Sequence, residues 1–154
     1  MVKSPPKKIN PEIKLIILGD GELKLFLSNL IKKFNLDESI LIIDYLENPY
    51  PLIEKCELLA LTSDWEGMPN VLIEAAYLEK KIISSDCDFG PNEIKKYANM
   101  TLFKKNDVFD FYEKLNNLIN IKELDTSGQK EYIKKNFNSN HIASKYMNLI
   151  KRGS

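Results

Sequence analysis

The chain has 154 residues, 44% of them hydrophobic, which is the size and composition of one folded domain. Its 22 basic and 22 acidic residues balance, so the composition gives no reason to expect nucleic acid as a partner. Because no stretch approaches the roughly 20 apolar residues of a membrane span, and the start lacks the apolar region of a signal peptide, we expect a cytoplasmic protein.

The N-terminal segment 1–12, which contains "SPPKKINP", is expected to be a disordered lead-in. Proline excludes regular backbone pairing, and little of this segment can be buried. No internal repeat or linker divides the rest of the chain, so we place a single domain over residues 13–154.

Four short apolar runs follow one another along this domain, at 14–19, 40–44, 58–62 and 81–85. Runs this rich in Ile and Leu are typical of strands buried on both faces, as in a parallel sheet covered by helices. The amphipathic segments that alternate with them predict helices within 21–35, 69–80, 90–98 and 107–120. The sequence therefore predicts an α/β fold, with one Rossmann-like parallel sheet and helices on both of its faces.

Beyond about Asn106 we expect helices only, ending with the segment 139–152. Ser139 is the predicted N-cap of this last helix, whose apolar stripe would comprise Ile142, Tyr146 and Leu149. From Lys130 onward six basic residues accompany a single acid. Such a pattern is usually a solvated helix face, and it leaves open a peripheral contact with an anionic membrane surface.

The chain has only two cysteines and one histidine, the residue types that most often bind transition metals or form disulfides. Cys56 and Cys87 are too few for a disulfide framework and are interpreted as reduced, partly buried thiols. The single histidine, His141, has no second ligand at zinc-like spacing and is interpreted as an ordinary helix residue.

The loops after the four apolar runs are the candidate site, because ligands of doubly wound sheets bind beyond the carboxyl ends of the strands. These loops read "GDGE", "DYLENPYP", "SDWEGMPN" and "SDCDFGPN", and two of them enter a helix through Gly and Pro. A proline in the first helical turn has no amide to leave unpaired. The free amides that follow, near Asn70 and Val71, are then oriented to receive an anion such as phosphate.

Glu74 lies in the middle of an apolar helical stretch, where burial of a carboxylate is costly unless a partner compensates it. It shares a helical face with Val71, Ala75 and Leu78. One interpretation is a half-exposed helix residue. The other is a carboxylate that accepts hydrogen bonds from ligand hydroxyls such as a ribose diol, with Glu66 at the other end of the ligand and a diphosphate held between them.

The segment "LLALTSDWEGMPNVLIEAA...KKIISSDCDFGPNEI" resembles the nucleotide-sugar-binding, C-terminal lobe of the retaining family 4 glycosyltransferases of GT-B fold. The mark of that family is two glutamates separated by seven residues, which match Glu66 and Glu74. The segments "LIILGDGE" and "ILIIDYLENPYPLIEKCELLAL" match the preceding parts of the family in order. The resemblance extends from about Lys14 to about Ile119.

This resemblance implies a donor site for a nucleoside-diphosphate sugar. Glu74 would bind the ribose hydroxyls, and Glu66, as the catalytic residue, would contact the transferred sugar. The loop that holds the phosphates, chiefly through its amides, would comprise Gly67, Met68, Pro69, Asn70, Val71 and Leu72. Gly19 and Gly21 would let the backbone approach the ligand, and the surroundings of the base would include Asp44, Tyr45 and Leu46. Neither a metal nor another cofactor is expected, and UDP and GDP fit equally well.

The sequence also departs from that family. Members carry, ahead of "LIILGDGE", a further strand and helix with a Gly-Arg pair and a downstream Lys that neutralise the diphosphate, and an opposing lobe binds the acceptor. About twelve residues precede the corresponding strand here. We therefore expect a partial donor-binding domain that is inactive alone, because charge stabilisation of the leaving group is a major catalytic term. The N-terminal lobe could then be supplied by a separate chain.

Three alternatives remain open. A non-catalytic interaction module would use the exposed sheet edge to bind a partner chain, and it would dimerise without nucleotide affinity. "GDGELK" imitates a dinucleotide-binding fingerprint, although Lys24 replaces its third glycine. "DCD", at 86–88, imitates a metal-binding acidic pair.

Overall fold

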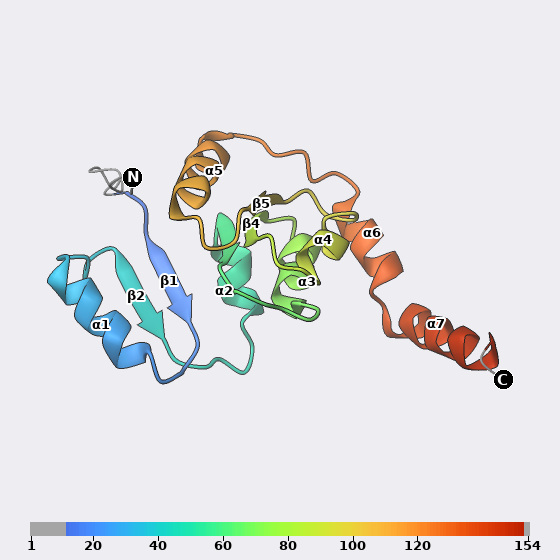
Figure 1. The fold of residues 1–154 in the computed structure, drawn as a ribbon. Coiled ribbons are helices and arrows are strands. Elements are labelled where there is room, and N and C mark those ends of the chain that lie inside the picture. Colours follow the sequence, from blue (N-terminus) through green and yellow to red (C-terminus); the bar gives the residue numbers. More distant parts are fainter. Residues whose placement is uncertain (1–11, 153–154) are drawn as a thin grey trace. The chain divides into compact units, whose positions relative to one another are not determined.

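The computed structural model describes residues 12–152, and the side chains of residues 12–148 (Figure 1). The expected disordered lead-in lies outside the described residues except for Glu12. Leu149, which belongs to the predicted apolar stripe of the last helix, lies outside the described side chains.

The secondary structure alternates strands and helices up to α5, and helices follow. The elements are β1 (Leu15–Leu18), α1 (Lys24–Lys33), β2 (Ile40–Ile43), α2 (Tyr50–Lys55), β3 (Leu58–Leu61), α3 (Asn70–Tyr77), β4 (Lys81–Ser85), α4 (Pro91–Ile94), β5 (Thr101–Phe103), α5 (Val108–Asn120), α6 (Gln129–Asn136) and α7 (Ser139–Arg152). All four predicted strands are present, and every strand pair is parallel, which confirms the α/β fold with a helical C-terminus. The sequence patterns had not indicated α2 or β5, whereas α6 lies in the part of the chain where only helices were expected.

The chain divides into two compact units, one ending at Pro49 and the other beginning at Tyr50, and each is described by itself. In the first, β1 pairs with β2; in the second, the strands lie in the order β3-β4-β5. Parallel pairing of the predicted strands is therefore confirmed within each unit. The domain boundary at residue 13 stays a prediction.

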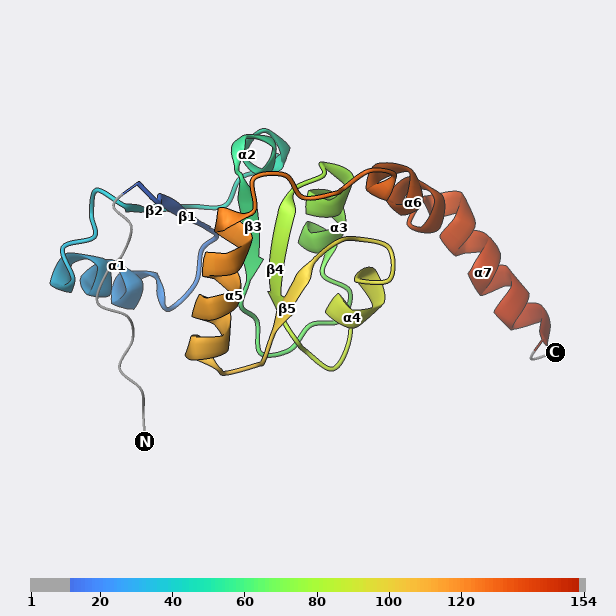
Figure 2. The same cartoon turned by 90° about the horizontal axis from the view of Figure 1, so that it is seen from above.

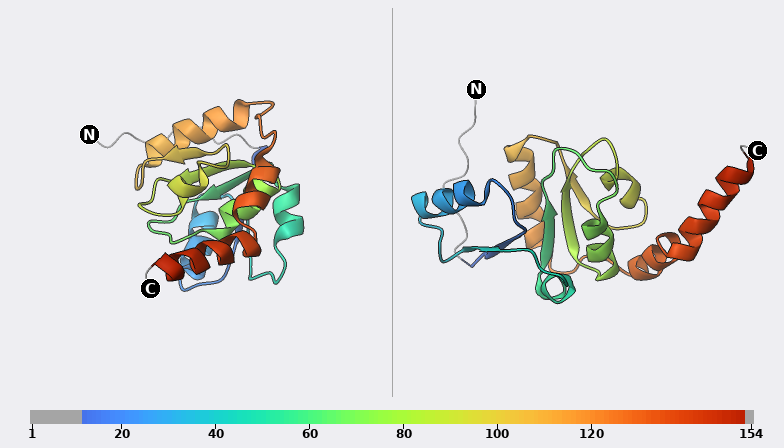
Figure 3. Two further views of the ribbon diagram at one scale, coloured as in Figure 1. Left: turned by 90° about the vertical axis from the view of Figure 1, so that its right-hand side faces the viewer. Right: turned by 90° about the horizontal axis from the view of Figure 1, so that it is seen from below.

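Strand β4 is the centre of the second unit, because it pairs with a strand on each side and is covered on both faces. Ile82 packs into the larger hydrophobic cluster, which includes residues of α3, α4 and α6. The next residue, Ile83, packs into a smaller cluster with Phe103 and Leu118 of α5. The alternation follows from the two-residue period of a strand. Accordingly, α5 lies on one side of the sheet, and α3 and α4 on the other (Figures 2 and 3).

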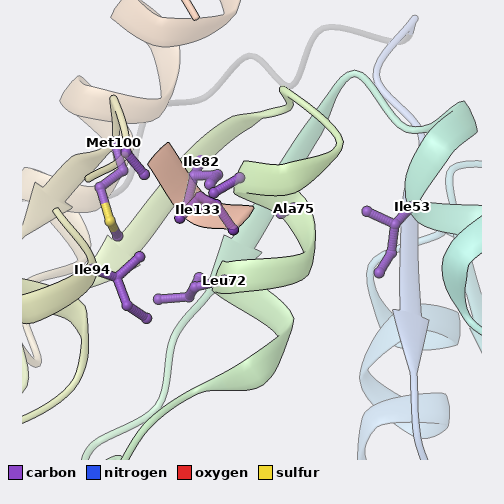
Figure 4. Close-up of a cluster of buried hydrophobic side chains, with 9 residues drawn as sticks. Ile53, Leu72, Ala75, Ile82, Ile94, Met100 and Ile133 are labelled. Carbon is purple, nitrogen blue, oxygen red and sulfur yellow. The ribbon is translucent and has the colours of Figure 1, made fainter. Parts of the chain in front are cut away.

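Helix α3 is held against the sheet by three residues with no exposed surface, Leu72, Ala75 and Ala76. Leu72 and Ala75 lie among the side chains of the larger cluster, together with Ile82 and Ile94 (Figure 4). The two alanines allow the helix backbone to come close to the strands. Since the predicted donor loop leads directly into α3, this packing fixes the position of the loop's end.

The N-terminus of α7 differs from its prediction. The amide of His141 donates a hydrogen bond to Oδ1 of Asn138 at 2.8 Å, so Asn138 is the capping residue. Ser139, the predicted N-cap, is the first residue of the helix. Asn and Ser are about equally good caps, so propensity could not separate two such neighbours. None of the helices within residues 12–152 is both long and apolar enough to span a membrane.

The unit ending at Pro49 has no buried residue among residues 12–49. Large apolar side chains are exposed on both its strands and its helix, namely Leu15, Ile16, Leu18, Leu25, Phe26 and Leu41. Two strands and one helix cannot cover both faces of a sheet, and a two-stranded sheet is only marginally stable in water. Most of the stabilising burial in the described chain therefore belongs to the second unit.

Replacement of Leu72 by alanine tests the importance of the α3 contact. Because Leu72 is completely buried, Leu72→Ala should lower the free energy of unfolding by about 2–5 kcal/mol, measured by urea denaturation. Leu25→Ala is the matched control: Leu25 is 72% exposed, so its loss should change stability by no more than about 0.5 kcal/mol. Equal effects of the two substitutions would contradict the assignment of the core.

Hydrogen exchange should separate the two units. Amides of β4 are covered on both faces and should be the more protected, whereas those of β1 and β2 should exchange at least about tenfold faster. Exchange measured residue by residue by NMR checks this expectation. Equal protection of β2 and β4 would contradict the difference in burial between the two units.

Candidate functional site

The loops that follow β3 and β4 are tied together at one edge of the sheet. Parallel pairing of β3 and β4 places both carboxyl ends at this edge. The carbonyl of Ser63 accepts a hydrogen bond from Oγ of Ser85 at 2.5 Å and another from Sγ of Cys87 at 3.0 Å. Cys87 is buried, so its thiol serves here as a structural donor. Both cysteines are free thiols, as predicted, although Cys87 is completely and not partly buried.

Gly90 lets the second loop lie directly against the first. Its φ of +81° is in the region that favours glycine, and a side chain at this position would clash. A Cβ atom there would lie 2.5 Å from Cδ of Pro69 and would also overlap the carbonyl oxygen of Gly67. This contact sets the course of the chain immediately before α3. The sequence could not predict why position 90 requires glycine, because the requirement comes from a contact with another loop.

The N-terminus of α3 presents two free amides. Pro69 is the N-cap, just outside the helix, and no side chain caps it. The amides of Asn70 and Val71 have no hydrogen-bond acceptor among the residues that the structure describes. The amide of Leu72, also predicted to hold phosphate, instead donates to the carbonyl of Pro69 at 3.0 Å. An anion at this helix end could therefore bind the amides of Asn70 and Val71 more readily than that of Leu72.

Glu74 is half-buried in α3, and its carboxylate accepts a hydrogen bond from a tyrosine. The hydroxyl of Tyr50, the first residue of α2, donates to Oε1 of Glu74 over 3.4 Å. The negative charge of Glu74 is the main cause that raises the pKa of Tyr50 above its ordinary value, followed by burial and by the hydrogen bond. The phenol is thus held in its neutral, donating form. Sequence reasoning missed Tyr50, because only the fold brings α2 beside α3.

Glu66 lies half-buried on the loop before α3, with no hydrogen-bond or ion-pair partner in the described part of the chain. Its neighbour Trp65 is 81% exposed. Gly67 is exposed, and a Cβ atom there would meet nothing within 4 Å. The structure therefore brings Glu66, the two free amides and Glu74 into one continuous segment around the start of α3.

A hollow of about 330 Å³ borders this segment at Met68. It is lined by two lysines, Lys145 of the basic C-terminal run and Lys96, which sequence reasoning did not single out. The rest of its lining comprises Glu93, Tyr97, Asn136, Phe137 and Ile142. Neither Glu66 nor Glu74 lines it. The hollow therefore lies beside the predicted donor segment, residues 66–74, and the two carboxylates of that segment lie outside it.

The remaining predicted site residues belong to the first unit, and their position relative to the second is not described. Within that unit the structure brings Gly19 and Asp44 to neighbouring strand ends, where the amide of Gly19 donates to the carbonyl of Ile43 at 3.0 Å. Gly19 has a φ of +139°, a conformation that favours glycine. Gly21 is exposed, Tyr45 is strongly exposed, and Leu46 is half-buried.

Asp44 is paired with Lys24, whose ammonium group donates to its carboxylate. This hydrogen bond is the main cause that raises the pKa of Lys24. Sequence reasoning treated Lys24 only as a departure from the dinucleotide-binding fingerprint. The structure gives it a partner at the end of the neighbouring strand.

The segment 56–79 contains five aspartates and glutamates but no lysine or arginine. An anionic ligand would therefore depend on backbone amides there.

Within the described residues, no group of three or more His, Cys, Asp or Glu side chains could hold a metal ion. Of the acidic pair at 86–88, Asp86 accepts a hydrogen bond from the side chain of Asn92. That the site uses no metal stays a prediction.

Comparison with known proteins identifies the family. The family described as glycosyl transferases group 1 matches residues 1–137. The chain belongs to this family. Solved structures of GT-B glycosyltransferases share its fold: HepE of Anabaena in complex with UDP-glucose superimposes with a TM-score of 0.80 at 19% identity, covering 93% of this chain and 42% of that one.

Two relatives illustrate the range of similarity among group 1 glycosyltransferases. An uncharacterized glycosyltransferase of Methanocaldococcus jannaschii is 45% identical over 84 residues, which is 54% of this chain and 21% of the relative. The GalNAc-alpha-(1->4)-GalNAc-alpha-(1->3)-diNAcBac-PP-undecaprenol alpha-1,4-N-acetyl-D-galactosaminyltransferase of Campylobacter jejuni is 31% identical over 151 residues, which is 94% of this chain and 40% of the relative. The chain thus spans well under half the length of these relatives.

Gly90→Ala should disturb the donor segment from a distance. The positive φ disfavours a side chain by about 1–2 kcal/mol, and the clash with Pro69 adds to this cost, so the free energy of unfolding should fall by more than about 1 kcal/mol. Gly67→Ala, in the facing loop but with open space around it, should stay within about 0.5 kcal/mol. Urea denaturation of both variants measures the difference, and an equally mild Gly90→Ala would contradict the tight contact between the loops.

Proposed function

We propose that the chain forms the donor-binding lobe of a retaining group 1 glycosyltransferase, which recognises a nucleoside-diphosphate sugar for the synthesis of a glycan or glycolipid. One observation carries this proposal: the free amides of Asn70 and Val71 and the carboxylate of Glu74 belong to one helix, fixed to the core by Leu72. Their relative geometry is therefore set within α3 itself.

In this function the first amides of α3 receive the diphosphate, aided by the positive end of the helix dipole. Glu74 accepts hydrogen bonds from the ribose hydroxyls. Glu66, half-buried and without a partner in the described chain, contacts the transferred sugar. The assignment of a retaining mechanism rests on the resemblance of the paired glutamates to family 4 and on no contact described above.

The comparisons support a nucleotide sugar as the ligand, since HepE was crystallised with UDP-glucose and, separately, with UDP. The name of the Campylobacter jejuni relative contains an undecaprenol-linked acceptor. An acceptor of that kind would place the enzyme at a membrane, and the basic residues from Lys130 onward are compatible with a peripheral contact. Both this contact and an N-terminal lobe on a separate chain stay proposals.

Titration with UDP, followed by NMR amide shifts, tests the proposal. Because no cation lies within 56–79, we expect a Kd of about 1 mM or weaker, with the largest shifts in residues 66–74. Glu74→Gln should weaken binding roughly tenfold, through loss of a charge-assisted hydrogen bond to the ribose. Glu79→Gln, which neutralises an exposed glutamate just beyond the same helix, is the matched control and should leave the Kd unchanged.

Inorganic phosphate and uridine separate the parts of the site. Phosphate should move the amides of Asn70 and Val71, whereas uridine should depend on Glu74. Shifts confined to loops other than 66–74 would exclude the proposed pocket. Dimerisation in sedimentation experiments together with absent nucleotide binding would instead favour the interaction-module alternative.

A further inference from the structure

Tyr50 and Glu74 form a side-chain contact that joins two helices of the second unit. The hydroxyl of Tyr50 donates to Oε1 of Glu74 over 3.4 Å, although 24 residues separate the two in sequence. No other hydrogen bond or ion pair to Glu74 is present among the described side chains. Its second carboxylate oxygen, Oε2, remains available to a ligand.

The helix that carries Tyr50 is anchored, so the hydroxyl has a defined position. Ile53, one turn further along α2, is buried in the same hydrophobic cluster as Leu72 and Ala75 of α3. Tyr50 itself remains 46% exposed, which leaves its edge open to solvent or ligand. The core thus holds α2 against α3 while the polar contact stays at the surface, where a ligand could reach it.

The direction of the hydrogen bond is settled near neutral pH. A phenol is protonated near neutral pH, and the charge of Glu74 raises the pKa of Tyr50 further, so the hydroxyl is the donor. A raised pKa means that this contribution to stability is fully present below the ordinary tyrosine pKa and is lost as the pH rises through the raised value.

We propose that Tyr50 is a positioning residue that orients the carboxylate of Glu74 so that its free oxygen meets the vicinal hydroxyls of a ribose. This inference rests on the proposed function, because it assumes that Glu74 receives the ribose. Tyr50 holds one oxygen and thereby limits rotation of the carboxylate. At 3.4 Å the hydrogen bond is long, and such contacts commonly shorten when the ligand completes the site.

Ribose selectivity provides the decisive test, because a merely structural role would not change it. The probes are UDP and its 2′,3′-dideoxy analogue, titrated against the full chain by NMR. The wild type should prefer UDP by about tenfold or more, since the analogue cannot donate to Glu74. Tyr50→Phe removes only the hydroxyl and should reduce this preference about threefold to fivefold, the size expected for one neutral hydrogen bond.

The matched control is Tyr77→Phe. Tyr77 lies in α3, as Glu74 does, and its hydroxyl has no hydrogen-bond partner in the described structure, so the selectivity for ribose should not change. In the Glu74→Gln background, Tyr50→Phe should have little further effect, because the two residues act through one contact. Unchanged melting temperatures show that Tyr50→Phe acts on recognition and not on folding.

A second readout needs no nucleotide. In a chain with ¹³C-labelled tyrosine rings, the Tyr50 signal should titrate at a lower pH in Glu74→Gln than in the wild type, because the charge that raises its pKa is removed. An unchanged titration would overturn the inference. Selectivity that depends on Glu74 but not on Tyr50 would overturn it as well, while leaving the proposed function intact. If UDP does not bind at all, the proposed function fails, and the inference fails with it.

Discussion

The burial of strand β4 on both faces is the constraint on which the second unit depends. A parallel strand cannot leave one face in water as an antiparallel strand can, so helices must cover both of its sides. The alternation of Ile82 and Ile83 between two hydrophobic clusters meets this requirement. Covering one face requires α3 to lie close to the sheet, and this fixes the helix end at which the candidate site begins.

The candidate donor segment therefore takes its geometry from apolar packing more than from polar contacts. Leu72 packs α3 against the hydrophobic core, and Gly90 allows the loop after β4 to lie against Pro69. The polar groups that would meet a ligand are left comparatively unoccupied: the first two amides of α3, the carboxylate of Glu66, and one oxygen of Glu74. A site built in this way binds through groups whose positions are settled before the ligand arrives, which reduces the ordering cost of binding.

The two units differ in how much of their apolar surface is covered. In the second, the hydrophobic cluster that contains Leu72 includes buried residues of α2, β4, α4 and α6, whereas residues 12–49 bury none of their side chains fully. Strand β1, with the sequence LIIL, has no buried residue, whereas β4, with the less apolar sequence KIISS, is buried from Ile82 to Ser85. The sequence of a strand determines which of its side chains are apolar, and the elements packed against the strand determine whether those side chains are buried.

Much of the fold could be predicted because it depends on local pattern. The apolar runs identified β1 to β4 as parallel strands, although their predicted burial on both faces was right only for β4. The spacing of Glu66 and Glu74 around "GMPN" placed one carboxylate on a loop and the other in a helix. These features follow from side-chain periodicity and from the preferences of Gly and Pro, which act within a few residues.

Contacts between segments distant in sequence could not be predicted in this way. The pairing of Tyr50 with Glu74, of Lys24 with Asp44 and of Gly90 with Pro69 each joins two elements that only the folded sheet brings together. The short strand β5, three residues long, carried too little periodicity to be recognised, and it is defined by its pairing with β4. The sequence by itself determined the class of fold and the residues offered to a ligand. Only the tertiary structure decided which of them are already engaged, because hydrogen bonding and burial depend on distances across the sheet and not along the chain.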